Sequence, residues 1–147
     1  MHQRISRQRE DFLNKLSTRW SKSHALIVLE SLQIGNMTRT AKGTVESPGS
    51  HVVQKSGLNR TILDQGWGKF AKMLEYKLAE RGGRLLLVPA QQSSQECSEC
   101  GYVAAENRPT RDLFRCVYCG HTGHADFNAA KVVLRRGLWI LEHQLAG

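Results

Sequence analysis

A chain of 147 residues is long enough for one domain of ordinary size, or for a small core domain with an inserted module, but not for two full domains. Apolar residues make up 40% of the sequence and charged residues 23%, proportions that exclude a disordered tail and predict a real core. Lysine and arginine outnumber aspartate and glutamate by 21 to 13, which gives a net charge of +8. This charge favours a polyanionic partner, DNA or RNA, over a merely solvated basic surface.

The longest apolar runs, 25–29 and 85–88, are far shorter than the roughly 20 residues of a membrane-spanning helix. The first residues are basic but have no apolar stretch after them, so they do not resemble a secretory signal. We therefore expect a cytoplasmic protein with no membrane partner.

Residues 4–20 have apolar side chains at nearly helical spacing, with arginines and lysines between them. The pattern predicts an amphipathic basic helix whose apolar residues are Ile5, Phe12, Leu13, Leu16 and Trp20. Its cations face either solvent or a phosphate backbone. Arg4 and Arg7 are accordingly candidate nucleic-acid contacts.

Residues 25–29 are a short apolar run with β-branched members, which predicts a strand buried on both faces. Glu30 ends this strand. Ligands gather beyond the carboxyl ends of strands in open sheets covered by helices, so Glu30 is a candidate catalytic acid. The segment 35–57 is rich in Gly, Ser, Thr and Pro and predicts a mobile basic loop, in which Arg39 and Lys42 are candidate nucleic-acid contacts.

Three further elements follow this loop. A helix is predicted over 67–78, ended by Gly82 and Gly83, and it is followed by a second buried strand over 85–88. The expected core positions of the helix are Trp67, Phe70, Ala71, Leu74 and Leu78. A last helix is predicted after Asp126, and its expected buried side consists of Ala130, Val133, Leu134, Leu138, Leu141 and Leu145.

Two copies of one pattern, CSECG at 97–101 and CVYCG at 116–120, each carry two cysteines separated by two residues and followed by glycine. The spacing between the pairs falls within the range of four-cysteine zinc sites. Disulfides are the alternative, but a reducing compartment is expected for a chain without a secretion signal. We predict one structural Zn²⁺ in a closed site formed by Cys97, Cys100, Cys116 and Cys119. The neighbouring His121 and His124 are expected to be surface or nucleic-acid contacts instead of ligands.

Asp126 begins the last helix, and Glu30 lies far upstream. Two acids on separate elements that converge through folding are what a Mg²⁺-dependent nuclease requires. Each acid also has a plainer explanation, since Asp126 would cap its helix and Glu30 would be a solvated residue at the end of a strand. The spacing of the two acids leaves both interpretations open.

The sequence resembles the C-terminal half of the TnpB or OrfB-type transposon-encoded proteins, relatives of CRISPR effector nucleases. The resemblance rests on seven segments in order: DFLNKLSTRW, IVLESL, DQGWGKFAKMLEYK, SSQECSECGY, ENR, FRCVYCGH and HADFNAAKVVL. It implies an α/β fold, in which a RuvC-like domain of the RNase H type is interrupted by a zinc ribbon. It also implies DNA cleavage directed by a guide RNA, with three acids binding Mg²⁺. Glu30 matches the second of these acids and Asp126 the third.

The family's first acid precedes the basic helix at which this chain begins, and Asp11 and Asp64 match other parts of the family. We therefore expect an incomplete RuvC-like domain in three parts: a partial domain over 1–90, the inserted zinc ribbon over 91–124 and the C-terminal helix over 125–147. An exposed sheet edge and an apolar patch should remain for a partner to cover.

Two functions remain open at this point. The favoured one is a DNA-binding fragment that does not cut DNA alone, with guide RNA as a further partner and with Arg4, Arg7, Arg39, Lys42, Arg108 and Arg111 as its contacts. The alternative is half of a Mg²⁺-dependent endonuclease, completed by a second chain that carries the missing strands.

Overall fold

The computed structural model describes residues 2–32, 46–56 and 66–145, so Arg39, Lys42 and Asp64 lie outside the described residues. The chain forms two units, one of residues 1–26 and 33–85 and the other of 27–32 and 86–147. The division falls within strands β1 (Leu26–Ser31) and β2 (Arg84–Pro89), which pair in a two-stranded sheet. The three-part domain division drawn from the sequence remains a prediction.

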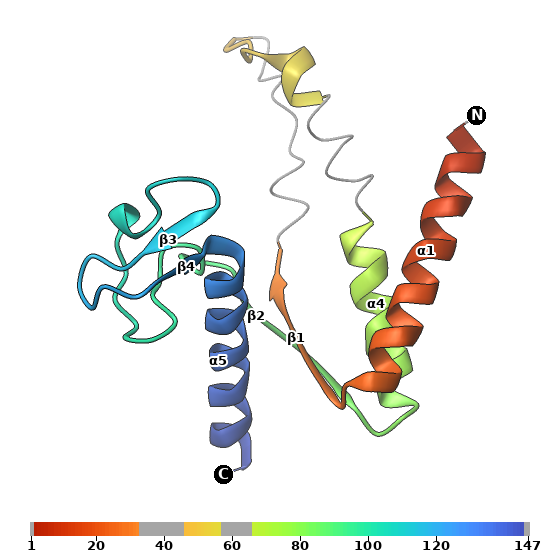
Figure 1. Ribbon diagram of the computed structural model, residues 1–147. Coiled ribbons are helices and arrows are strands. Elements are labelled where there is room, and N and C mark those ends of the chain that lie inside the picture. Colours follow the sequence, from red (N-terminus) through yellow and green to blue (C-terminus); the bar gives the residue numbers. More distant parts are fainter. Residues whose placement is uncertain (1, 33–45, 57–65, 146–147) are drawn as a thin grey trace. The chain divides into compact units, whose positions relative to one another are not determined.

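The first unit is built on helix α1 (His2–Ser23), which packs beside α4 (Trp67–Ala79) (Figure 1). The predicted basic helix is confirmed, but its buried face differs from the expected one. Leu13 is buried as expected, whereas Phe12 is 61% exposed, and the other buried positions are Ser17 and Ser21. Small side chains at four-residue spacing let the helices approach closely, and both hydroxyls donate to carbonyls of their own helix.

Helix α4 buries Phe70, Leu74 and Leu78, as its spacing predicts, and it also buries Lys77. Trp20 of α1 meets Phe70 edge-on, with ring centroids 5.3 Å apart. The predicted end of the helix is confirmed, because Gly82 has a φ of 71° and the Gly83 N–H donates back to the Leu78 carbonyl at 2.8 Å.

The second unit contains most of the sheet. Strand β1 buries Ile27 and Leu29, but the predicted burial on both faces is only partly correct, because Leu26 and Val28 on the other face are half-buried. Strand β2 is less buried than predicted, because Val88 is fully covered while Leu87 is 53% exposed. Successive side chains of a strand point to opposite faces, so the exposed Leu87 and the buried Val88 lie on opposite faces of β2.

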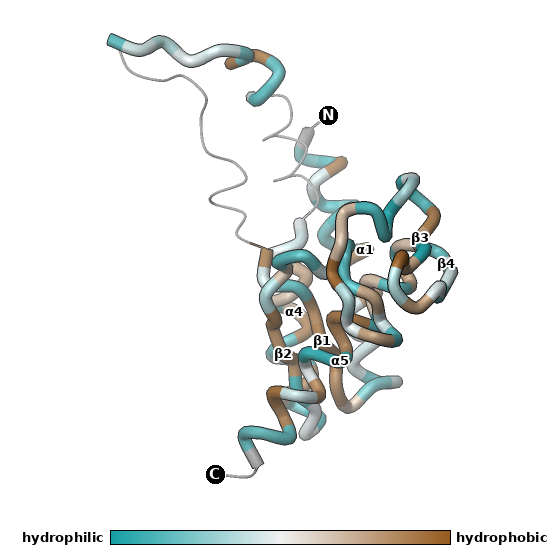
Figure 2. Tube along the Cα trace, turned by 90° about the vertical axis from the view of Figure 1, so that its left-hand side faces the viewer, coloured by the Kyte–Doolittle hydropathy of each residue, from teal (hydrophilic) through white to brown (hydrophobic). Residues whose placement is uncertain are grey.

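Helix α5 (Ala125–Leu145) begins where the sequence predicts, but the expected buried face is only partly correct. Val133 is buried, whereas Leu134 and Leu138 are 47% and 44% exposed. The buried face instead runs through Ala125, Asn128, Val132, Val133 and Gly137. Gly137 fixes this rotation, because it lies so close to Val28 of β1 that a Cβ would approach Val28 Cγ2 to 2.5 Å. Hydrophobic residues recur along α5 (Figure 2), and Leu134, Leu138 and Trp139 among them are exposed.

The cysteine region forms a small module of the second unit, with a short 3₁₀ helix (Ala105–Asn107) and an antiparallel hairpin of β3 (Leu113–Arg115) and β4 (Thr122–His124). Leu113 pairs with His124, and Arg115 pairs with Thr122. The core of this module contains Phe114, Cys97, Cys116 and Ala125. Among the described helices, none is long and apolar enough to cross a membrane.

Candidate metal centre and acidic residues

The four cysteines come together as their spacing predicts, with all four sulfurs within 4.8 Å of one another. The Sγ atoms of Cys97 and Cys119 lie 3.7 Å apart, and those of Cys100 and Cys116 lie 3.6 Å apart. A disulfide has a bond of about 2.05 Å, whereas a tetrahedral Zn²⁺ site with Zn–S distances of about 2.3 Å separates its sulfurs by about 3.8 Å. The four cysteines are free, and their arrangement fits Zn²⁺.

The two cysteine turns have the same backbone geometry. The Cys97 N–H donates to the Tyr102 carbonyl at 2.9 Å, and the Cys116 N–H donates to the His121 carbonyl at 2.8 Å. Gly101 and Gly120 close the turns with φ values of 79° and 77°, in the left-handed region that favours glycine. Each turn presents its two sulfurs to the same centre, so the closed four-sulfur set has no open position for water or substrate.

The metal-free thiols differ in acidity. Desolvation opposes ionisation of Cys116, but the N–H groups of Cys119 and Tyr118 and the thiols of Cys100 and Cys119 together lower the pKa of Cys116 to about 7. The Tyr102 N–H favours the Cys100 thiolate, yet desolvation and the neighbouring sulfurs raise the pKa of Cys100 to about 12. Neighbouring sulfurs cannot all ionise without a cation, so this cluster is arranged to hold a positive ion.

Asn107, which the sequence analysis did not single out, cross-links the two turns. Its side chain is fully buried, its Nδ2 donates to the Gln95 and Tyr102 carbonyls at 2.8 and 3.1 Å, and its Oδ1 accepts from the Val117 N–H at 2.9 Å. Asn128 of α5 makes a similar pair of contacts on either side of Cys97. No spacing rule reveals these amides, because their partners are backbone groups that only folding brings near them.

Glu30 lies near the end of β1, as predicted, and its carboxylate accepts a hydrogen bond from Ser93, a buried residue of the segment between β2 and the first cysteine. Ser93 is a second residue that the sequence analysis missed. Its hydroxyl gives the Glu30 carboxylate a fixed neighbour.

Asp126 lies in the first turn of α5, and its side chain is 80% exposed. It faces the Arg108 guanidinium at 3.9 Å, while its own N–H donates to Nδ1 of His124 at 3.2 Å. Both candidate acids therefore belong to the second unit, each at the end of its element. Among the described residues, the polar partner of Glu30 is Ser93 and that of Asp126 is Arg108, and the joint role of the two acids in binding Mg²⁺ remains a prediction.

The histidines beside the cysteines have other contacts. His124 stacks edge-on against Phe127 with centroids 5.5 Å apart, and His121 lies 6.3 Å from the Phe114 ring. Neither belongs to the clustered group of metal-ligating side chains in the described residues.

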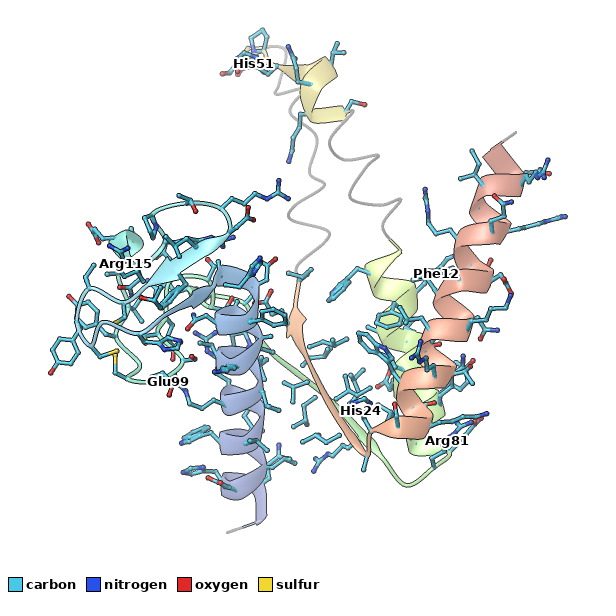
Figure 3. The ribbon with its side chains drawn as sticks, viewed as in Figure 1. Phe12, His24, His51, Arg81, Glu99 and Arg115 are labelled. Atoms are coloured by element: carbon cyan, nitrogen blue, oxygen red, sulfur yellow. The ribbon has the colours of Figure 1, made fainter. Side chains whose placement is uncertain are left out.

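The candidate nucleic-acid contacts fall into three sets. Arg4 and Arg7 are exposed on α1, Arg39 and Lys42 lie outside the described residues, and Arg108 and Arg111 belong to the cysteine module. Arg108 has two partners in its surroundings, because it donates to the Arg111 carbonyl at 2.8 Å and faces Asp126. Arg115 of the same module is labelled in Figure 3.

Comparison with known proteins places this geometry in a family. A family model described as the TNB domain of Cas12f1-like proteins matches residues 67–133, from the start of α4 to the middle of α5. InsQ of Escherichia coli (strain K12), named as a candidate RNA-guided DNA endonuclease, is 48% identical over 141 residues, which are 96% of this chain and 35% of InsQ. A protein of Streptomyces pristinaespiralis with the same description is 33% identical over 94% of this chain and 31% of its own length.

The fold has a solved counterpart. The cryo-EM structure of a Cas12f1–sgRNA–target DNA complex contains a chain that is 22% identical and superposes with a TM-score of 0.55, over 86% of this chain and 34% of that one. This likeness shows the α/β fold. The chain thus spans about a third of the length of the relatives it matches, and it belongs to the TnpB-type family.

Proposed function

We propose that this chain is a nucleic-acid-binding portion of a TnpB-type protein and that it does not cut DNA alone. The observation that carries the proposal is the distribution of charge. The first unit holds 15 of the 21 lysines and arginines and 6 of the 13 acidic residues, a net charge of +9, whereas the second unit has a net charge of −1. A polyanion would accordingly bind the helical unit and not the cysteine module.

Helix α1 offers a suitable surface. Arg4, Lys15 and Lys22 are exposed and, by helical periodicity, lie on the side opposite the buried Leu13 and Ser17. A helix of 22 residues is about 33 Å long, close to the roughly 34 Å of one turn of duplex DNA. Contacts spread over such a length bind phosphates without reading bases.

The four cysteines are proposed to hold Zn²⁺ as a structural ion. Zn²⁺ would neutralise the clustered thiolates and fix the two turns, and the site offers it no catalytic position. The closed arrangement of Cys97, Cys100, Cys116 and Cys119, with sulfurs too far apart for disulfides, supports this proposal.

The proposed partners are target DNA and a guide RNA. Cas12f1 was solved with both, and InsQ is named as a candidate for RNA-guided cleavage. The resemblance implies three acids for cleavage, and this chain matches two of them, Glu30 and Asp126. Their described partners are Ser93 and Arg108, so an assembled Mg²⁺ site is not proposed for this chain on its own.

Binding is tested by fluorescence anisotropy with labelled double-stranded DNA, single-stranded DNA and RNA over a range of salt concentrations. The affinity should fall steeply with salt, since each phosphate contact contributes a slope of about −0.9 on duplex DNA. Replacing Arg4, Lys15 and Lys22 by Gln should reduce this slope by up to about 3. The matched control replaces Arg108, Arg111 and Arg115 by Gln in the cysteine module and should change the slope little. Salt-independent binding, or a larger effect of the control set, would contradict the proposal.

A second candidate function is half of a Mg²⁺-dependent endonuclease completed by another chain. The observation that favours it is the exposed apolar side of α5, where Leu134, Leu138 and Trp139 are 47%, 44% and 58% exposed in the same unit as both acids. Restoration of Mg²⁺-dependent cleavage by an added N-terminal part of a TnpB-type protein, lost again in Asp126→Ala, would support this second function over simple binding.

A further inference from the structure

We infer that Asn128 is a positioning residue that fastens the first cysteine turn to the first turns of α5, so that Zn²⁺ binding and the order of this helix end are coupled. The inference rests on the proposed zinc site. It goes beyond that site because Asn128 is neither a ligand nor one of the family's three acids.

The contacts of Asn128 enclose one ligand residue. Its Nδ2 donates to the Glu96 carbonyl at 2.7 Å, and its Oδ1 accepts from the Ser98 N–H at 2.9 Å. These two backbone groups flank Cys97 on either side. Asn128 is only 2% exposed, so water does not replace its amide readily if the contacts are lost.

Helix α5 contacts the first cysteine turn at a second point, about two helical turns after Asn128. Arg135 Nη1 donates to the Ser98 carbonyl at 2.9 Å, and its guanidinium pairs with the Glu96 carboxylate. Positions 128 and 135 are seven residues apart and therefore lie on one side of the helix. The neighbouring Arg136 also pairs with the Glu96 carboxylate, so residues 96–98 are held along α5 by three of its side chains.

The helix end also enters the core of the cysteine module. Ala125, the first residue of α5, is fully buried with Cys97 and Cys116, and its N–H donates to the Asp112 carbonyl at 2.8 Å. Asp126 is the next residue. Asn128 and the Ala125 contact join the Cys97 turn to the helical turn that carries Asp126. If the Cys97 turn becomes less ordered, this helical turn should therefore become less ordered as well.

Asn107 provides a matched comparison. It too is a buried asparagine that binds backbone groups next to the cysteines, but its partners Gln95, Tyr102 and Val117 all belong to the cysteine module. Loss of Asn107 should weaken the metal site without releasing α5. Loss of Asn128 should weaken the site and also uncouple the helix from it.

The test combines zinc competition against a chromophoric chelator with amide hydrogen exchange over residues 125–132, using the full chain with and without Zn²⁺. Asn128→Ala should lower the zinc affinity about 10-fold or more, as expected for loss of a group that orients a ligand. Asn128→Asp keeps the acceptor for Ser98 but loses the donor to Glu96, so it should also bind zinc more weakly. Glu142→Gln, an exposed change near the other end of α5, should leave the affinity unchanged.

In the wild-type chain, removal of Zn²⁺ should raise exchange over 125–132, a measurement that needs no variant to fold. Asn128→Ala should show this raised exchange with Zn²⁺ still bound, whereas Asn107→Ala should keep the zinc-dependent protection. An affinity of Asn128→Ala within threefold of wild type, or exchange over 125–132 that ignores Zn²⁺, would overturn the inference. A wild-type chain that holds no Zn²⁺ would instead refute the proposed zinc site.

Discussion

Lys77 is a buried cation between α1 and α4. Its Nζ donates to the Asn14 carbonyl and to the Ser17 and Thr18 hydroxyls at 2.8 Å each, and to Asn14 Oδ1 at 2.6 Å. The side chain is 6% exposed. A lysine is rarely buried unless its charge is solvated by such oxygens, so this ammonium acts as a buried polar link between the two helices.

Lys77→Met should destabilise the chain by about 1–3 kcal/mol, because it leaves buried acceptors of α1 without their donor. Urea unfolding followed by tryptophan fluorescence measures the change. Lys72→Met, an exposed change on the same helix, is the control and should shift the free energy of unfolding by less than about 0.5 kcal/mol. Equal effects of the two substitutions would show that the buried oxygens of α1 do not depend on Lys77.

The pH dependence of the same pair gives a second test. Desolvation, and then the Arg81 guanidinium, lower the pKa of Lys77 below its ordinary 10.5, while Glu80 opposes them and the α1 groups that face it are uncharged. The unfolded chain therefore holds this proton more tightly, so the free energy of unfolding rises with pH between the lowered pKa and 10.5. The advantage of wild type over Lys77→Met should widen when unfolding is measured at pH 10 instead of pH 7. A constant or shrinking difference would contradict the assigned direction.

At the scale of elements, the hydrophobic pattern predicted helices α1, α4 and α5 and strands β1 and β2, but not the short strands β3 and β4, the helical turn at 52–56 inside the predicted loop, or every buried face. On α1 the helical period placed Phe12 in the core, whereas the packing uses Ser17 and Ser21 because their small size permits close contact with α4. On α5 the helical period of the apolar residues placed Leu134 and Leu138 in the core, but both are exposed. The true face is set by Gly137 and Asn128, two residue types that periodicity of apolar side chains does not score.

Gly137→Ala should destabilise the chain by about 1–3 kcal/mol, since a Cβ would meet Val28 Cγ2 at 2.5 Å and Cγ1 at 2.7 Å. The opposite sign is expected in an exposed helix, where alanine is better than glycine by about 1 kcal/mol. Val28 has a stiff β-branched side chain and cannot easily turn away.

The matched measurement is a double-mutant cycle with Val28→Ala by thermal or urea unfolding. In that background the added methyl group has room, so Gly137→Ala should become neutral or stabilising. An additive cycle would mean that Gly137 does not set the packing of α5 on β1.

Some residues of the candidate site could be predicted from the sequence, and others could not. The cysteines are predictable because metal ligands must recur at fixed spacing, and Glu30 and Asp126 are recognisable from their place in the family pattern. Ser93, Asn107 and Asn128 are not, because their roles depend on backbone groups brought near them by folding. Arg108 lies beside Asp126, a neighbour that its position in the sequence did not reveal, and its contact with nucleic acid remains a prediction.

At the scale of the whole molecule, metal binding should act on one unit. The purified chain should contain one Zn²⁺, and Cys116→Ser should lose it, because a three-sulfur set no longer closes the site. Removing Zn²⁺ with a chelator should raise amide exchange over 95–124 and leave α1 and α4 protected, since neither helix belongs to the unit that holds the cysteines. Unchanged zinc content in Cys116→Ser, or loss of protection across both units together, would contradict this separation.

DNA cleavage requires acids from several separate elements to come together in one site. We therefore expect that the isolated chain does not cleave DNA. A two-metal nuclease site holds its ions about 3.5–4 Å apart, and clustered carboxylates must offset their charge while both the attacking and the leaving oxygens are fixed. Here Glu30 accepts a hydrogen bond from Ser93 and Asp126 lies beside Arg108, so the chain offers only two of the three acids that the resemblance implies. Mg²⁺ gives up its waters reluctantly for so incomplete a ligand set. Incubation of the purified chain with supercoiled plasmid and Mg²⁺ should therefore yield no cleavage above the level of Asp126→Ala, at salt concentrations where the same preparation binds DNA. Mg²⁺-dependent cleavage that disappears in Asp126→Ala would show that these two acids suffice and that the non-catalytic part of the proposal is wrong.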